Sequence, residues 1–226
     1  MPPDRRNPLV VALDTSDTAT AVDLAGRLAG TVALLKVGLQ LFTAAGPDVV
    51  GLVRGHAPVF LDLKLHDIPT TVARAAWNAG RLGPTLLTVH SLGGPAMVEA
   101  AVREAAAGAK DAGFDPPSVI AVTVLSSIGG ESLASPASLA FEAVSAGAAG
   151  VVVSGDDVKT VREVLGDESI VVVPGVRPSG AGANDHARVL TPHEAIASGA
   201  DYIVVGRPIT ESADPPAAAR AVLAEL

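Results

Sequence analysis

The chain has 226 residues, no cysteine and a formal net charge of −8 at neutral pH, and 49% of its residues are hydrophobic. That apolar content allows a sizeable core, and the lack of cysteine excludes disulfides, thiolate zinc sites and cysteine nucleophiles. The negative charge argues against a nucleic-acid partner. No apolar run approaches the roughly 18 residues of a membrane span, and the first residues do not read as a signal peptide, so we expect a soluble, cytoplasmic protein without a membrane partner.

Eight short runs rich in β-branched residues recur along the chain, each followed by an Ala-rich stretch with helical spacing. Most runs are continuously apolar, which is typical of parallel strands covered on both faces, and no hairpin signal separates them. The pattern predicts a single-domain α/β protein, a (β/α)8 TIM barrel over residues 9–226 after a short tail (1–8), with an open doubly wound sheet as the alternative. The predicted strands are residues 9–15, 32–38, 59–65, 86–91, 119–126, 150–155, 170–176 and 202–208.

Polar residues gather at the carboxyl ends of these runs, which is where a barrel of this kind places its active site. They are Asp14, Lys36, His90 and Ser126, at the ends of the first, second, fourth and fifth runs, and Arg177 and Arg207 after the seventh and eighth.

The third run, within LDLKLHDIP, departs most from an apolar strand because Asp62 and Lys64 interrupt it and Asp67 follows. Strand residues two apart point to the same side, so Asp62 and Lys64 share a face. Charged residues are seldom buried unless they are paired, so this pair is a functional candidate. Asp67 precedes Ile68 and a proline, so it could simply cap the next helix.

A phosphate site is predicted by the segments after the last two runs. The stretch 174–191 is long and rich in Gly, Ala and Ser, and Gly206-Arg207 follows the eighth run. Barrels frequently bind phosphate in these two loops through backbone N–H groups, and arginine adds a bidentate partner. No two histidines have the spacing of metal ligands, so no metal site is predicted.

Several segments together resemble the orotidine 5′-monophosphate decarboxylase family. They are VALD, LKVGLQLF, FLDLKLHDIPTTV, VTVLSS, PGVRPSGAGANDHARVLTP and IVVGRPIT, in the family's order from about Leu9 to Thr210. The resemblance implies a homodimeric (β/α)8 barrel that needs no cofactor or metal. It also implies a small nucleotide substrate, orotidine 5′-monophosphate, which is converted to UMP and CO2 in the last step of UMP biosynthesis.

Carried over residue by residue, the resemblance implies a catalytic array of Lys36, Asp62, Lys64 and Asp67, with Asp67 reaching into the partner's site. Lys64 would stabilise a carbanion at C6 and then protonate it, while the two aspartates keep Lys64 charged. The implied substrate contacts are Asp14 and Lys36 at the ribose, Asp62, Ile68 and Thr71 (the last two crossing the interface), Ser126 and Pro174 at the base, and Arg177, Gly206 and Arg207 at the phosphate. His186 stands where many bacterial members carry glutamine, and a histidine N–H can serve as the same donor.

Two alternatives compete with this interpretation. The 3-keto-gulonate 6-phosphate decarboxylases and hexulose phosphate synthases share Asp-x-Lys-x-x-Asp but use Mg2+, with a glutamate on strand two where this chain has Lys36. A catalytically silent phosphate-binding barrel would be expected to lack at least one of Asp62, Lys64 and Asp67, and all three are present.

Overall fold

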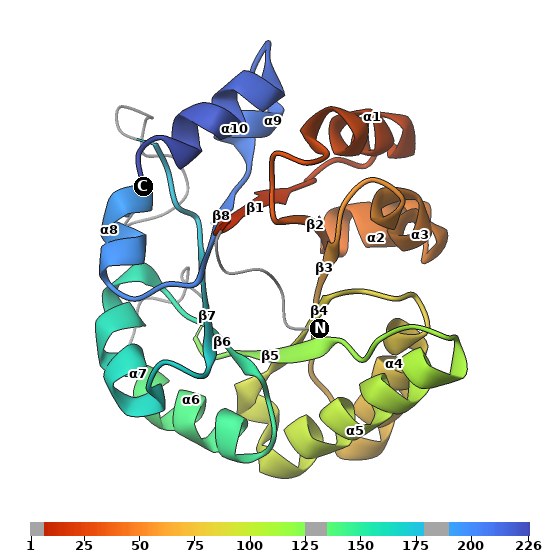
Figure 1. Cartoon of the computed structure of the whole chain (residues 1–226). Coiled ribbons are helices and arrows are strands. Elements are labelled where there is room, and N and C mark those ends of the chain that lie inside the picture. The colour runs from red at the N-terminus through yellow and green to blue at the C-terminus, as the bar shows by residue number, and fades with distance from the viewer. Residues whose placement is uncertain (1–6, 125–134, 179–189) are drawn as a thin grey trace.

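The protein is described by a computed structural model that covers residues 7–124, 135–178 and 190–226. Its strands are all parallel and form a closed barrel in the order β1 to β8, with β8 hydrogen-bonded to β1. Figure 1 looks along this barrel and shows the helices as a ring outside the strands. The (β/α)8 barrel predicted from the sequence is therefore confirmed, and the open sheet is excluded.

The elements alternate along the chain. The strands are β1 (Leu9–Ala12), β2 (Leu34–Gly38), β3 (Val59–Leu65), β4 (Leu86–His90), β5 (Ser118–Val122), β6 (Gly150–Val152), β7 (Ile170–Pro174) and β8 (Tyr202–Val205). The α-helices are α1 (Thr18–Leu28), α2 (Leu39–Ala45), α3 (Asp48–Arg54), α4 (Pro69–Gly80), α5 (Pro95–Asp111), α6 (Pro136–Ser145), α7 (Val158–Leu165), α8 (Pro192–Ala197), α9 (Arg207–Thr210) and α10 (Pro215–Leu223). Two short 3-10 helices, η1 (Ser91–Gly93) and η2 (Gly155–Asp157), follow β4 and β6.

The core has two parts because side chains alternate across each strand. One set, including Val10, Leu34 and Phe60, fills the barrel interior, and a larger set lies between the strands and the surrounding helices. The alternation that puts Leu34 and Phe60 inside also puts Lys36 and Asp62 on the interior side. Each lies two residues nearer the carboxyl end of its strand. The barrel is therefore apolar at depth and charged near its mouth.

Several predicted strands extend too far at their carboxyl ends. Leu13, Thr123, Val153 and Val176 lie beyond the last strand residue yet are buried, between 0% and 2% exposed. Three of them, Leu13, Thr123 and Val153, still donate a backbone hydrogen bond to the neighbouring strand, so burial and apolar character continue past the residues that pair regularly as a strand. Lys36 lies within β2 rather than at its end.

The fifth run was predicted to end at Ser126, but β5 ends at Val122, and Ser126 lies outside the described residues. The predicted bounds of the third strand, residues 59–65, agree with β3.

Arg162 on α7 ties the outer helix to the amino-terminal side of β7 and β8. Its guanidinium donates to the carbonyl oxygens of Gly166, Ser169 and Gly199 at 2.7–2.9 Å and to Oδ2 of Asp201 at 2.6 Å. The Arg162 and Asp201 side chains are 16% and 13% exposed. One side chain thus satisfies several carbonyls, at the end of the barrel away from the charged mouth.

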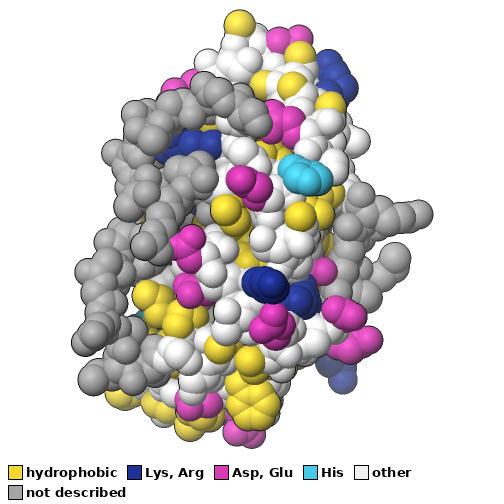
Figure 2. All heavy atoms as spheres, turned by 90° about the vertical axis from the view of Figure 1, so that its left-hand side faces the viewer, with side chains coloured by type: hydrophobic (Ala, Val, Ile, Leu, Met, Phe, Trp, Pro, Cys, Tyr) yellow, Lys and Arg dark blue, Asp and Glu magenta, His cyan; other side chains and the backbone are white. Residues whose placement is uncertain are grey.

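No helix among the described residues is long and apolar enough to cross a membrane. On the face shown in Figure 2, which is the left-hand side of Figure 1, the coloured acidic and basic side chains are intermixed, and no single basic patch stands out.

Candidate active site

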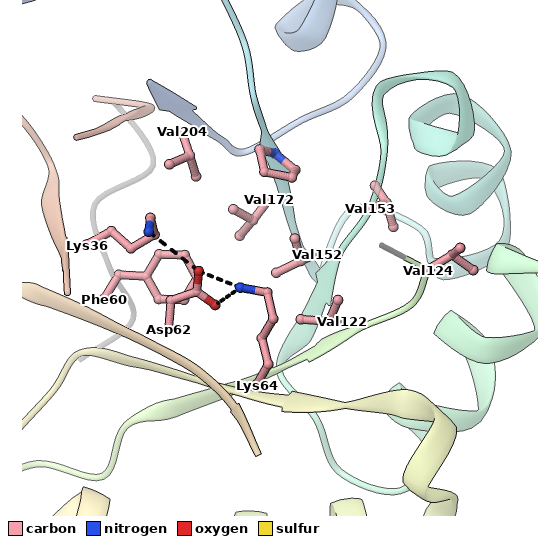
Figure 3. Close-up of a pocket in the computed structure, with 11 residues that line it drawn as sticks. Lys36, Phe60, Asp62, Lys64, Val122, Val124, Val152, Val153, Val172 and Val204 are labelled. Atoms are coloured by element: carbon pink, nitrogen blue, oxygen red, sulfur yellow. Dashed lines mark hydrogen bonds and ion pairs between the residues drawn. The ribbon is translucent and has the colours of Figure 1, made fainter. Parts of the chain in front are cut away.

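A buried carboxylate between two lysines lies near the carboxyl ends of β2 and β3. Asp62 is 8% exposed. Lys64 Nζ donates to both of its carboxylate oxygens at 2.8 Å, and Lys36 Nζ lies 3.7 Å from its Oδ2. Figure 3 shows Asp62 between the two ammonium groups, which approach from different strands. The pairing of Asp62 with Lys64 that their spacing predicted is confirmed.

Lys36 also contacts the end of the first strand. Its Nζ donates to Oδ1 of Asp14 at 3.1 Å, and the side chains of Lys36 and Asp14 are 12% and 53% exposed. Gly38 lies two residues further along β2, and a Cβ placed there would be 2.8 Å from Lys36 Nζ. The lysine ammonium therefore occupies space that only a glycine at position 38 leaves open.

The backbone of β3 is irregular at Lys64. The pairing of β3 with β4 shifts between Leu61 and Leu65, and Lys64 has a φ of 51°, which is the left-handed region. That conformation costs a residue with a Cβ roughly 1–2 kcal/mol. The Lys64 N–H donates to Oγ1 of Thr88 on β4 at 2.8 Å. A strained residue at this point is a reason to look for function, because strain persists only where the surroundings enforce it.

The charged groups border a cavity of about 170 Å3 at the barrel mouth. Figure 3 shows Lys36, Asp62 and Lys64 on one side of it and valines of the later strands on the other. Its lining residues are Lys36, Phe60, Asp62, Lys64, Val122, Val124, Val152, Val153, Val172, Pro174 and Val204. A largely apolar pocket with a few convergent charges is typical of a small-molecule site.

Two histidines, one just after β3 and one at the end of β4, stack on each other. The rings of His66 and His90 are 5.0 Å apart with 24° between their planes, and the Leu92 N–H points to Nδ1 of His90 at 3.3 Å. Burial lowers the pKa of His90, and the nearby positive charges of His66 and Lys64 lower it further. The hydrogen bond from the Leu92 N–H makes Nδ1 of His90 an acceptor, which is a ring nitrogen without a proton.

The residues predicted to cross the dimer interface lie away from Lys36, Asp62 and Lys64 of the same chain. Asp67 and Ile68 are exposed between β3 and α4, Thr71 is exposed in the first turn of α4, and none of them lines the cavity. The N-cap of α4 is Ile68 rather than Asp67, no side chain caps the helix, and Oδ1 of Asp67 accepts a hydrogen bond from the adjacent Ile68 N–H at 2.6 Å. The simple interpretation of Asp67 as the helix cap is therefore wrong.

The residues predicted to bind phosphate lie after β7 and β8. Arg177 is 9% exposed, and its N–H donates to the carbonyl of Leu190 at 3.1 Å, so the segments after β7 and before α8 lie side by side. Gly206 precedes α9, and a Cβ there would be 3.8 Å from Oδ2 of Asp14. Arg207 is exposed at the start of α9. His186, like Ser126, lies outside the described residues.

Lys36, Asp62 and Lys64 can act on a ligand by electrostatic stabilisation and by proton transfer. Among residues 7–124, 135–178 and 190–226 no three His, Asp or Glu side chains gather in a way that could hold a metal ion. Two ammonium groups flanking one buried carboxylate form a fixed field, and an ammonium is also a proton donor. The site therefore suits a reaction that develops negative charge on a ligand in the cavity.

Two kinds of functional residue escaped the sequence analysis. The valines that line the cavity read as ordinary core, although Val122, Val152, Val172 and Val204 belong to the same interior set as Phe60. Thr88 is fully buried within an apolar run, where a β-branched residue raises no suspicion. Only the register of β4 against β3 could have drawn attention to it.

Comparison with known proteins agrees with this geometry. The model of the family described as "Orotidine 5'-phosphate decarboxylase / HUMPS family" matches residues 7–222. The chain belongs to this family. It is 47% identical over 231 residues to the orotidine 5′-phosphate decarboxylase of Paramagnetospirillum magneticum, covering 97% of this chain and 98% of that one. It is 49% identical to the corresponding protein of Anaeromyxobacter dehalogenans, covering 100% of both.

A solved structure supports the same assignment. The crystal structure of orotidine 5′-phosphate decarboxylase from Lactobacillus acidophilus superposes with a TM-score of 0.83 at 37% identity, covering 97% of this chain and 98% of that one. The family resemblance seen in the sequence is therefore confirmed across the whole barrel.

Proposed function

We propose that this enzyme is a carboxy-lyase that converts orotidine 5′-monophosphate to UMP and CO2 without a metal ion, the last step of UMP biosynthesis. The observation that carries the proposal is the Lys36–Asp62–Lys64 array at the rim of an apolar cavity. The family assignment and the full-length relatives named as orotidine 5′-phosphate decarboxylases support the substrate. A cytoplasmic location remains a prediction from the sequence.

Lys64 is the proposed proton donor. Loss of CO2 from C6 of the pyrimidine leaves a carbanion with little resonance stabilisation, so the protein must supply a positive charge beside it. The Lys64 ammonium is held by Asp62 through two 2.8 Å hydrogen bonds and borders the cavity. The same ammonium can then transfer a proton to C6, which completes the product.

Asp62 and Lys36 hold this donor in place. The Asp62 carboxylate attracts the Lys64 ammonium, and Lys36 lies against its other side. Lys36 also bridges Asp62 to Asp14, which is exposed enough to meet the ribose hydroxyl groups as proposed. Pro174 and the valines would provide the flat apolar walls that a pyrimidine ring needs.

The phosphate is proposed to lie between the loops after β7 and β8, near Arg177, Gly206 and Arg207. Gly206, after β8, lies close to the carboxylate of Asp14, which follows β1. The phosphate is remote from the reacting bond, so its binding energy is available to complete the site around the base. His186 and Ser126 stay predictions as further ligands.

We propose that the protein forms a homodimer with shared active sites, and that residues 66–71, which lead from β3 into the first turn of α4, lie at its interface. Ile68 is 66% exposed although it is a large apolar residue, and Asp67 beside it makes no ion pair among the described residues of its own chain. A second copy that covered Ile68 would bury this apolar surface and bring Asp67 toward the partner's Lys64. Thr71 would cross the interface in the same turn.

The Mg2+-dependent sugar-phosphate decarboxylases and aldolases of this superfamily fit less well. Those enzymes need a carboxylate on strand two, and β2 carries Lys36, whose ammonium lies 3.7 Å from Asp62. A divalent cation placed beside Asp62 would meet two lysines at close range, and like charges repel.

The activity is tested by incubating the purified chain with orotidine 5′-monophosphate and following the loss of its ultraviolet absorbance, with and without EDTA. The proposal predicts turnover that EDTA does not change. Turnover that EDTA abolishes and Mg2+ restores would contradict the metal-free mechanism. No turnover with this nucleotide, together with turnover of a sugar phosphate in Mg2+, would move the chain to the other branch of the family.

The shared site is tested by complementation. Lys64→Ala and Asp67→Asn chains should each form nearly inactive homodimers, whereas a heterodimer keeps one site with both native residues. Random exchange of equal amounts makes about half of the dimers mixed, so roughly a quarter of all sites should be active. Failure to recover activity, with heterodimers confirmed by mass, would mean that Asp67 acts within its own subunit.

A further inference from the structure

One buried hydroxyl joins the two residues at the centre of the array. Thr88 on β4 is 0% exposed. Its Oγ1 donates to Oδ1 of Asp62 at 3.0 Å and accepts a hydrogen bond from the backbone N–H of Lys64 at 2.8 Å. No other described side chain bonds both to the Asp62 carboxylate and to the backbone of Lys64.

The N–H of Lys64 needs this partner because of the irregularity in β3. The shift of pairing between Leu61 and Leu65 takes Lys64 out of the regular ladder with β4. A buried N–H without a partner is costly, and the Thr88 hydroxyl takes the place of the missing backbone acceptor. The left-handed φ of Lys64, 51°, is thus held by a side chain of the neighbouring strand.

The direction of the hydroxyl proton follows from the same two bonds. A hydroxyl has one proton, and a backbone N–H can only donate, so the proton of Thr88 is directed at Asp62. That hydrogen bond fixes Oδ1, while Oδ2 remains turned toward Lys36. The Thr88 hydroxyl therefore bonds to the Asp62 carboxylate and to the backbone of Lys64 at the same time, and couples the position of one to that of the other.

We propose that Thr88 is a positioning residue for the decarboxylation, and that its hydroxyl sets the place of the Lys64 ammonium relative to the reacting carbon. The inference rests on the proposed function. Thr88 does not line the cavity, so it acts through Asp62 and Lys64 rather than on the substrate. Its loss should therefore lower kcat far more than it raises KM.

The experiment compares three variants with the native enzyme. Thr88→Val keeps the shape of the side chain and removes the hydroxyl, and Thr88→Ser keeps the hydroxyl. Thr123→Val is the matched control, because Thr123 is also 0% exposed and its hydroxyl donates to a backbone carbonyl, that of Val152 at 3.1 Å, rather than to Asp62. For each variant kcat, KM, the melting temperature and the hydrogen-exchange rate of the Lys64 amide are measured.

We expect Thr88→Val to lower kcat roughly 10- to 100-fold, the effect of losing a hydrogen bond to a charged group, with KM changed less than about threefold. Thr88→Ser should stay within about fivefold of native kcat. Thr123→Val should change the melting temperature but leave kcat close to the native value. Native kcat in Thr88→Val, or a serine variant as impaired as the valine variant, would overturn the proposal.

The exchange measurement separates this inference from the proposed function. The Lys64 amide should be protected in the native and serine proteins and should exchange at least about tenfold faster in Thr88→Val. If the native chain failed to decarboxylate the nucleotide, the proposed function would fall, and this exchange would still decide whether Thr88 holds Lys64. An amide equally protected in all variants would refute the positioning role.

Discussion

A methyl group at position 38 should disturb catalysis while leaving the fold almost unchanged. In Gly38→Ala the new Cβ would be 2.8 Å from Lys36 Nζ, whereas ordinary contacts begin at 3.4 Å, so the ammonium has to move by at least 0.6 Å (3.4 − 2.8). The backbone accepts alanine without strain, because Gly38 has φ −96° and ψ −176°.

The energetic and kinetic consequences differ in size. Lys36 can shift its tip because the side chain is flexible, and its pair with the 53% exposed Asp14 contributes no more than about 1 kcal/mol to stability. A displacement of about 1 Å in a catalytic group can cost on the order of 100-fold in rate. We therefore expect kcat/KM to fall by about tenfold, and the free energy of unfolding to change by less than about 1 kcal/mol.

The assay is steady-state decarboxylation together with chemical denaturation. Gly51→Ala is the matched control, since Gly51 lies inside α3 with nothing within 4 Å of the added Cβ. The control should gain roughly 0.5–1 kcal/mol of stability and keep native activity. Native kcat/KM in Gly38→Ala would refute the argument that the position of the Lys36 ammonium matters.

Three further predictions concern stability, pH and assembly. Arg162→Ala should lower the free energy of unfolding by about 3 kcal/mol, measured by denaturation, because it strips partners from several carbonyls and from Asp201. The lowered pKa of His90 means that its contribution to stability is complete above the unfolded pKa of about 6.5 and declines as the pH falls below it. His90→Gln should therefore flatten the loss of stability in acid, and the same change at exposed His193 should not. Ile68→Asp should yield monomers in light scattering, whereas the same change at exposed Leu52 on α3 should leave the assembly intact.

The fold could be predicted from the sequence because the barrel repeats one strand-and-helix unit along the chain. Eight apolar runs with intervening helical patterns admit few closed arrangements, and each run corresponds to a strand of the barrel. The carboxyl ends were less accurate, since Leu13 and Val176 are buried without being in a strand. Burial can be predicted from the sequence, but the end of regular strand pairing depends on the neighbouring strands, and Leu13 still donates to the Lys36 carbonyl beyond the end of β1.

The candidate site was only partly predictable. The spacing of Asp62 and Lys64 indicated a shared face, and the structure pairs them directly. The left-handed backbone conformation of Lys64 could not be predicted from the sequence. Residues with a Cβ seldom adopt it, and nothing in LDLKL signals a shift of register. The role of Thr88 was equally hidden, since a hydroxyl gains its meaning from what the neighbouring strand places opposite it.

In the proposed mechanism the ammonium of Lys64 drives the decarboxylation. The most direct test is to measure the rate at which Lys64→Ala releases CO2 from carboxyl-labelled orotidine 5′-monophosphate. Lys159→Ala, at an exposed lysine on α7, is the control. Lys64→Ala should remain folded, because Asp62 keeps Thr88 and Lys36 beside it, and should release CO2 at least about 1,000-fold more slowly than the native enzyme, since both the field and the proton donor are lost. A folded Lys64→Ala protein that retained more than about one-hundredth of the native rate would contradict the claim.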